Sequence, residues 1–292
     1  MSLLSAARRL VGEILGRRVT GYVRRRLRRS RAAFNPYCSI LRGKRGVEIG
    51  GPSELFGDEG FLPVYGAMQS IDNSVFSANT IWTGQLQEGK TFKYHPSKAP
   101  GGQFVCEASD LRLLKDGSYE CVLASHSLEH IANPLRALGE WKRVLGEGGF
   151  LLLILPHKDG TFDWRRPPTT LDHMIEDYRN NVGEEDLTHL TEILALHDLT
   201  KDIPAGSMEQ FRQRCLENYS NRGMHHHVFD TRTAVALVDH AAFQVLRVDT
   251  VEPFHIVVLA RRCEGQPDNA QFLWETARYR RQSPFASDRG AT

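Results

Sequence analysis

Two short apolar runs with an amphipathic segment between them organise the chain. Residues 119–124 form a run that is long enough for a buried strand and too short for a helix. Asn133 and Pro134 then offer a helix N-cap and a first-turn proline, and apolar residues follow at helical spacing on one face. Gly148 and Gly149 are expected to end this helix before a second apolar run, residues 150–155. The pattern predicts a strand, a helix and a second strand parallel to the first.

Weaker patterns on both sides of this unit extend the predicted sheet. Further strands are expected over residues 45–49, 64–71, 104–106, 243–251 and 255–261. A helix is expected over residues 230–240, and the polar residues 83–102 are typical of a surface loop. From residue 264 the chain is polar, so we expect a tail with one short helix over 269–280 and a flexible end.

The composition is that of a soluble globular protein. The chain has 292 residues, 41% of them hydrophobic and 25% charged, which suits one large domain with a tail at each end or at most two small domains. No apolar run approaches the 18 residues that a membrane-spanning helix needs. The five cysteines are widely spaced and form no C-x-x-C pair. A reducing cytoplasm is therefore the expected location.

The first 32 residues form a separate basic arm. Residues 1–31 hold ten arginines and one glutamate, a net charge of +9 against +2 for the whole chain, so the rest carries −7. The apolar positions of residues 2–30 repeat at helical spacing, and arginines fill the other face. Three interpretations stay open: residues 2–31 bind an anionic membrane surface from the cytoplasmic side, the helix packs on the protein's own body, or it is a mitochondrial presequence.

Two segments carry a resemblance to a known family. Residues 47–53 read V-E-I-G-G-P-S, a short strand that ends in a glycine turn. Residues 125–149 read S-H-S-L-E-H-I-A-N-P-L-R-A-L-G-E-W-K-R-V-L-G-E-G-G. This second segment resembles the region after the fourth strand of class I S-adenosylmethionine (SAM)-dependent methyltransferases, and it is most similar to the methyltransferase-11-like group.

The resemblance implies a fold and a domain plan. The fold is α/β, with a Rossmann-like seven-stranded methyltransferase sheet that is mostly parallel and has an antiparallel last strand. Residues 33–263 would form this domain. Residues 156–228 are far longer than an ordinary connection and would form a helical cap inserted after the fifth strand. Residues 264–292 would be the C-terminal tail.

The resemblance also implies that SAM is the cofactor, and it assigns the residues that bind it. Glu48 would hold the methionine end, Asp72 would accept from the ribose hydroxyls, and Asp110 would accept from the adenine amino group. Further cofactor contacts are expected from Gly50, Gly51, Pro52, Ser53, Asn73, Leu111, Ser125 and His126. The glycine turn departs from the family's Gly-x-Gly, and it also lacks the G-x-G-x-x-G of a nicotinamide enzyme.

A second motif overlaps this region. Residues 126–130 read H-S-L-E-H, which matches the inverted zincin signature H-x-x-E-H. A metalloprotease would need both histidines on one long helix, and Asn133 with Pro134 interrupts any such helix. We therefore expect no metal, and expect Glu129 and His130 to brace the loop through hydrogen bonds.

The catalytic group is expected to be a histidine, because a hydroxyl acceptor needs a base that works near neutral pH. His157, directly after the fifth strand, is the first candidate and His126 the second, with a cap histidine such as His173 or His226 third. Asp163 is expected to orient the base.

The cap is dense in His, Asp, Arg and Trp, which suits a polar acceptor such as a saccharide, a lipid-linked glycan or a related small molecule. The predicted activity is O-methylation of such a hydroxyl. Two alternatives are a catalytically inactive methyltransferase-like binding module and a nucleic-acid methyltransferase that uses the basic arm. The acidic body offers no second basic surface, so nucleic acid is the less favoured partner. The sequence leaves the oligomeric state undetermined.

Overall fold

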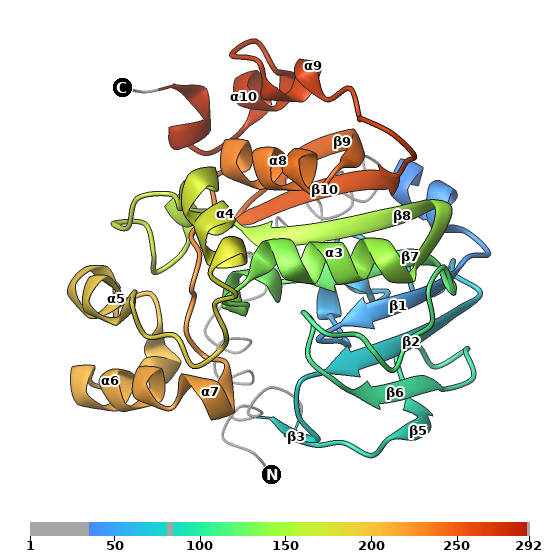
Figure 1. Ribbon diagram of the computed structural model, residues 1–292, viewed down its shortest axis with the longest axis horizontal. Helices are drawn as coiled ribbons and strands as arrows, with labels where there is room; N and C mark the ends of the chain where they lie inside the picture. Colours follow the sequence, from blue (N-terminus) through green and yellow to red (C-terminus); the bar gives the residue numbers. More distant parts are fainter. Residues whose placement is uncertain (1–34, 81–83, 291–292) are drawn as a thin grey trace, which may run out of the picture.

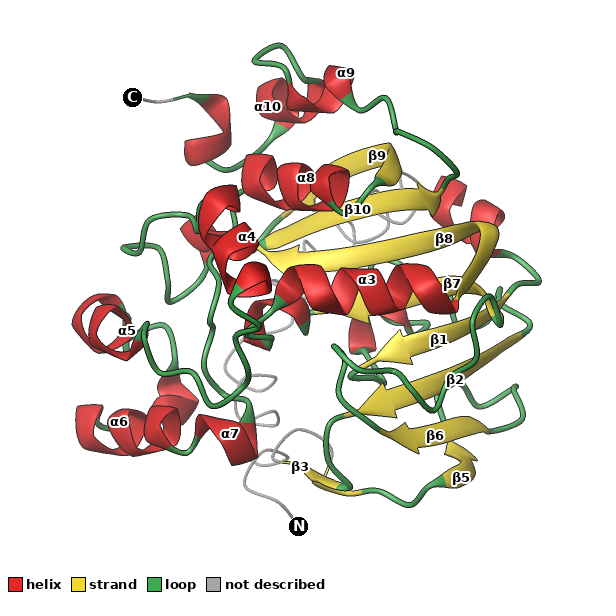
Figure 2. Ribbon diagram, viewed as in Figure 1, coloured by secondary structure: helices red, strands yellow, loops and turns green. Residues whose placement is uncertain are grey.

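A single eight-stranded sheet forms the centre of the molecule (Figures 1 and 2). The structure is a computed structural model, and it describes residues 35–80 and 84–290. The strands lie in the order β5-β6-β2-β1-β7-β8-β10-β9. Their bounds are β1 Arg45–Ile49, β2 Ser70–Val75, β5 Gly89–Phe92, β6 Gly101–Val105, β7 Tyr119–Ser125, β8 Leu145–Pro156, β9 Phe243–Val251 and β10 His255–Arg262. A two-stranded ribbon, β3 Asn79–Thr80 and β4 Gly84–Gln85, lies beside it.

The pairing directions confirm the predicted class of fold. The neighbours β6, β2, β1, β7 and β8 pair in parallel, and β10 runs antiparallel to both β8 and β9. The sheet has one strand more than expected, because β5 pairs antiparallel with β6 at the edge. This strand falls in the polar segment expected to be a loop, and three of its four residues are exposed, so no apolar alternation marked it.

The central helix α3, Pro134–Val144, begins as the sequence indicates and ends earlier. The Asn133 side chain accepts a hydrogen bond from the Arg136 backbone N–H, which makes it the N-cap. The helix ends at Val144 rather than at the glycine pair, and β8 begins at once. Gly148 has φ +66°, and the pairing of β7 with β8 is irregular beside it. The two glycines therefore form a bulge in the strand.

The second strand also differs from its expected bounds, with a consequence for the site. Residues 64–68 are a turn whose Val64, Tyr65 and Met68 side chains are buried, and β2 begins only at Ser70. A buried turn and a buried strand have similar composition, so periodicity could not separate them. Asp72 therefore lies within β2, paired with Val47, instead of following its end.

Helices cover both faces of the sheet. On one face lie α3, α4 Leu171–Arg179 and α8 Thr231–His240, and they share one apolar core with β7, β8 and β10. On the other face, helical residues 35–41 and the segment that includes the short helix η1 Glu54–Phe56 contribute the second core. Asp230 caps α8 by accepting from the Thr233 N–H.

The cap packs around a small core of its own. Its further elements are α5 Leu190–Leu196, α6 Met208–Leu216, α7 Asn218–Asn221 and the short helices η3 Lys158–Gly160 and η4 Ile203–Ala205. Ile193, Phe211, Cys215 and Met224 are buried together there. Figure 1 shows α5, α6 and α7 on the side toward which the parallel strand arrows point.

The C-terminal segment is packed rather than a flexible tail. It contains α9 Ala270–Leu273, α10 Arg278–Gln282 and the short helix η5 Ser287–Arg289, where one helix was expected. Tyr279, Phe285 and Asp288 are at most 5% exposed. Within residues 35–80 and 84–290 no helix is both long and apolar enough to cross a membrane. The basic arm, residues 1–32, lies outside the described residues.

Candidate functional site

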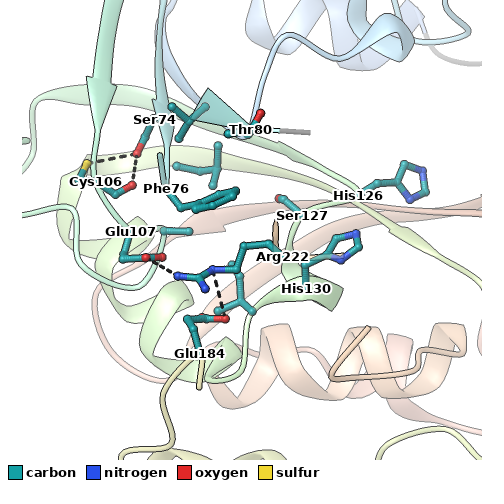
Figure 3. A pocket seen from close by; sticks show the side chains of 15 residues that line it. Ser74, Phe76, Thr80, Cys106, Glu107, His126, Ser127, His130, Glu184 and Arg222 are labelled. Carbon is teal, nitrogen blue, oxygen red and sulfur yellow. Dashed lines mark hydrogen bonds and ion pairs between the residues drawn. The ribbon is translucent and has the colours of Figure 1, made fainter. Parts of the chain in front are cut away.

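A pocket opens at the carboxyl edge of the parallel strands, where ligands bind in open α/β sheets (Figure 3). It encloses about 830 Å³ of space, its open mouth included. The loops after four adjacent strands and two cap residues line it: Ile49, Gly50, Ser74, Val75, Phe76, Thr80, Cys106, Glu107, Ala108, His126, Ser127, His130, Ile131, Glu184 and Arg222. Of the predicted site residues, only Gly50 and His126 are in this lining.

The glycine turn after β1 is held from behind by buried polar groups. The Glu48 carboxylate accepts from the Tyr65 hydroxyl at 2.7 Å and from the Ser53 N–H at 3.0 Å. The Asn73 side-chain oxygen accepts from the Gly51 N–H at 2.9 Å. A Cβ on Gly51 would lie 2.3 Å from the Glu48 carboxyl carbon, so only glycine fits there. Glu48 and Asn73 therefore shape the turn and do not line the pocket.

Burial raises the pKa of Glu48, the carboxyl group that holds the glycine turn in place. Glu48 is 1% exposed, and burial raises its pKa to about 8, although the hydrogen bonds from Tyr65 and Ser53 oppose the shift. The Ser53 and Ser125 hydroxyls lie 3.1 Å apart and join the turn to the end of β7. Pro52 is exposed. Glu48, Pro52, Ser53 and Ser125 thus stand around the turn, outside the pocket lining.

Asp72 and Asp110, predicted to bind the ribose and the adenine, do not line this pocket. The Asp72 carboxylate accepts from the Gly102 N–H at 2.5 Å and from the Tyr119 hydroxyl at 2.9 Å. Asp110 accepts from the Arg112 guanidinium at 2.8 Å, in a separate surface hollow, and Leu111 is fully buried. The late start of β2 puts Asp72 behind the pocket, two residues short of Ser74.

Other residues occupy those two positions at the pocket. Ser74 and Phe76 line it after β2, and Glu107 lines it after β6, three residues before Asp110. The E-A-S-D-L segment thus offers two acidic residues, and the structure turns the first toward the pocket. The sequence showed both acidic residues, but it did not show which of them faces the pocket.

An arginine from the cap reaches into the same pocket (Figure 3). Arg222 Nη2 lies 2.6 Å from Glu107 Oε1, and its Nε lies 3.7 Å from Glu184 Oε2. The guanidinium also stacks 4.9 Å from the centre of the Phe76 ring. Burial raises the pKa of Glu184 to about 7 against the opposing charge of Arg222. No motif marked Arg222 or Glu184, because only the folded cap brings them to the strand ends.

Two histidines stand on the pocket wall after β7. His126 has a left-handed backbone, φ +50°, and its Nε2 lies 2.9 Å from Nδ1 of His255. Its Nδ1 lies 3.6 Å from the buried Glu129 carboxylate. Burial and His126 together lower the pKa of His255 to about 3, so this neighbour stays neutral. Burial lowers the pKa of His130 to about 4.

The other catalytic candidates lie elsewhere. His157 is fully buried, 3.2 Å from Asp288 and stacked 4.0 Å from the Phe285 ring, so it cannot reach an acceptor in the pocket. Asp163, 2% exposed, pairs with Arg166 and His225. His226, 1% exposed, hydrogen-bonds Asn218. The C-terminal segment and the cap bury these groups, which no local pattern indicated.

His173 likewise has a partner outside the pocket. Its Nε2 lies 3.1 Å from Nε2 of His189, and it also pairs with Asp177 at 3.4 Å. Among the described histidines, His126 and His130 are those that line the pocket.

One segment of the chain and its overall fold are similar to known proteins. Residues 79–153 match the family model of a methyltransferase domain. No curated protein sequence matches the chain. Similar solved structures include a SAM-dependent methyltransferase from Mesorhizobium loti, with 13% identity, a TM-score of 0.42, and coverage of 78% of this chain and 96% of that one. A SAM-dependent methyltransferase from Aquifex aeolicus has 13% identity and a TM-score of 0.36, covering 79% and 88%.

A third similar structure is the trans-methyltransferase CalH in complex with SAH, with 14% identity, a TM-score of 0.43, and coverage of 79% of this chain and 55% of that one. At these identities and TM-scores the three structures assign no role to any residue of this chain.

Proposed function

We propose that the chain is a class I SAM-dependent methyltransferase and that it methylates a hydroxyl oxygen of a polar acceptor. The acceptor class is a saccharide, a lipid-linked glycan or a related small molecule. The observation that carries the proposal is the position of His126, which lines the pocket beside the glycine turn and has a fixed hydrogen-bond partner in His255.

The pocket has the chemistry that SAM requires. Ile49, Val75 and Phe76 offer apolar surface for the adenine ring. Ser74 and Glu107 offer oxygen acceptors for the ribose hydroxyls, and Arg222 offers a cation for the carboxylate. Gly50, at φ +78°, holds the backbone in a turn without a side chain in the way. When bound, SAM supplies a methyl group on a positively charged sulfur.

His126 acts as the base in this proposal. Its Nδ1, 3.6 Å from the Glu129 carboxylate and so beyond a direct hydrogen bond, would accept the hydroxyl proton when the acceptor oxygen takes the methyl group. SAM would supply the methyl group and would be left as SAH, with a neutral sulfur. The hydrogen bond between Nε2 and His255 fixes the ring's orientation, and the Glu129 carboxylate would stabilise the protonated ring. His126 replaces His157 as the favoured base, because His157 is fully buried.

The cap supports a polar acceptor. Trp164 is 42% exposed, and Arg165 and Lys201 lie 5.0 and 5.5 Å from the centre of its ring. An exposed aromatic ring flanked by cations can stack on a sugar and bind an attached phosphate. The lipid-linked alternative draws its support from the basic residues 2–31, which suit an anionic membrane surface.

Titration calorimetry with SAH tests the cofactor site. Wild type is expected to bind at micromolar concentration, and Gly50→Val at least about tenfold more weakly, because valine avoids a positive φ and would project into the pocket. Asp110→Asn is the matched control outside the pocket and should bind as wild type does. If folded wild type does not bind SAH, the binding-module alternative replaces methyl transfer.

A transfer assay tests the acceptor. Labelled methyl from SAM should appear on oligosaccharides or lipid-linked glycans and not on RNA or DNA. Transfer to nucleic acid instead would contradict the acceptor class. Full-length protein should also sediment with anionic liposomes at low salt, and a protein lacking residues 2–31 should not; equal sedimentation of both would remove the membrane part of the proposal.

A further inference from the structure

We propose that Glu129, His130 and His225 form a binding site for a divalent transition-metal ion. One potential ligand atom from each of these residues lies within 4.8 Å of the other two. Glu129 and His130 belong to the loop after β7, and His225 belongs to the cap, 95 residues further along the chain. The His130 and His225 rings are 4.6 Å apart between centroids.

The ligand types fit this class of ion. Two imidazoles and one carboxylate are a ligand set for zinc, iron(II), manganese and related metals. Ligand atoms around such an ion lie roughly 3–3.5 Å from one another, as follows from bond lengths near 2.1 Å. Modest side-chain movement would bring the three groups from their present spacing to that distance.

The strongest independent observation is that Glu129 is buried with one carboxylate oxygen unpaired. This side chain is 1% exposed, and its Oε2 has no hydrogen-bond partner among the described residues. A buried carboxylate oxygen without a partner is costly, and native structures rarely leave one. Its Oε1 lies 3.8 Å from His130 Nε2. A cation bound by Glu129 and His130 would compensate the buried negative charge.

The two histidines are oriented as metal ligands usually are. His225 Nδ1 lies 2.6 Å from Asp163 Oδ2, and His130 Nδ1 lies 3.1 Å from the Met224 carbonyl oxygen. When Nδ1 carries the proton that donates these bonds, the lone pair of Nε2 is available to a metal. Arg166 holds Asp163 at 3.1 Å. The site thus gives the buried Asp163 a positioning role.

The geometry differs from the zincin that the H-S-L-E-H sequence suggested. Residues Leu128–His130 form a single 3-10 turn, and His126 Nε2 is next to His255. The second imidazole comes instead from the cap. The expectation of no metal rested on the missing long helix, and a site built from two distant segments does not need one.

The role of the ion rests on the proposed function. His130 lines the pocket, and Figure 3 shows it on the same wall as His126. Three protein ligands leave a coordination position open. An acceptor hydroxyl bound there would have a lowered pKa and would release its proton more easily to His126. The ion would also join the cap to the sheet.

Cobalt(II) titration of the full chain tests the site. The protein is freed of any histidine tag and dialysed against a chelator, and the visible absorption of bound Co²⁺ is followed. Wild type should bind one equivalent. His225→Ala and Glu129→Gln should each weaken binding at least about tenfold, since even an indirect ligand contact is worth that much. His173→Ala is the control and should bind as wild type does, because His173 contacts His189 and Asp177 instead.

Two results would overturn the site. One is the absence of stoichiometric Co²⁺ binding by folded wild type. The other is binding that survives His225→Ala and disappears in His173→Ala, which would place the ion at the His173–His189 pair. Melting curves establish that each variant folds. Because the titration needs neither cofactor nor acceptor, metal binding without methyl transfer would leave the site standing and reject the proposed function.

Discussion

His157 Nε2 lies 3.2 Å from Oδ1 of Asp288, and both side chains are fully buried. The contact joins the end of β8 to the C-terminal segment. Burial acts to raise the pKa of Asp288, but the hydrogen bond and charge of His157, with hydrogen bonds from Ser283 and Thr231, hold it below its ordinary value. This network fixes the last helices against the sheet.

The first prediction follows from this pair. His157→Ala should lower the free energy of unfolding by up to about 3 kcal/mol, because the buried Asp288 carboxylate loses its imidazole partner and keeps only the hydrogen bonds from Ser283 and Thr231. Urea unfolding measures the loss. The affinity for SAH should stay within about twofold of wild type, since His157 is outside the pocket lining. A variant that is as stable as wild type but does not turn over would return His157 to the role of base.

Local signals predicted the elements that local interactions determine. The Asn133 cap, the first-turn proline and the apolar stripe define α3, and β1 appears with the expected bounds. The bounds of β2 failed because a buried turn precedes it, and the apolar positions of both read alike. Because of that shift, Asp72 lies within β2 and outside the pocket lining.

The site was predictable where a strand end supplies the residue. Gly50 and His126 follow β1 and β7 directly, and both line the pocket. Arg222 and His225 come from the cap, whose path depends on its own small core. His157 also follows a strand, but the C-terminal segment covers it. Contacts between segments so far apart leave no periodic trace in the sequence.

The second prediction concerns the base. His126→Ala should lower methyl transfer by at least about a hundredfold, the contribution of a positioned general base. Its affinity for SAH should change little, because the glycine turn and the apolar wall remain. Radiolabel transfer at saturating SAM, together with calorimetry, separates the two quantities. Loss of SAH affinity with unchanged turnover would make His126 a cofactor contact only.

The third prediction compares Glu107, which follows β6 and lines the pocket, with Asp72, which lies within the neighbouring strand β2. Glu107→Gln should weaken SAH binding about tenfold, because a charged hydrogen bond contributes about 1.5–3 kcal/mol. Asp72→Asn should leave the affinity unchanged and lower stability by about 1 kcal/mol, through the contacts to Gly102 and Tyr119. Calorimetry and urea unfolding of both variants check this. The reverse outcome would restore Asp72 as the ribose acceptor.

The fourth prediction is a pH dependence that originates at Glu48. Burial raises its pKa from 4.5 to about 8, so between these values the folded state holds a proton that the unfolded state has released. The free energy of unfolding contributed by Glu48 therefore falls as pH rises through this window, by at most about 1.4 kcal/mol per pH unit. The glutamine of Glu48→Gln cannot titrate, so this variant should lack the fall in the free energy of unfolding that comes from Glu48.

Urea unfolding of wild type and Glu48→Gln at pH 5, 6, 7 and 8 measures this fall as a difference. The difference is needed because buried His226 and His255, with pKa values lowered to about 3, contribute in the opposite direction in both proteins. Wild type should lose stability relative to the variant steadily from pH 5 to pH 8. Curves that stay parallel would mean that Glu48 is ionised throughout, and that the Tyr65 and Ser53 hydrogen bonds outweigh its burial.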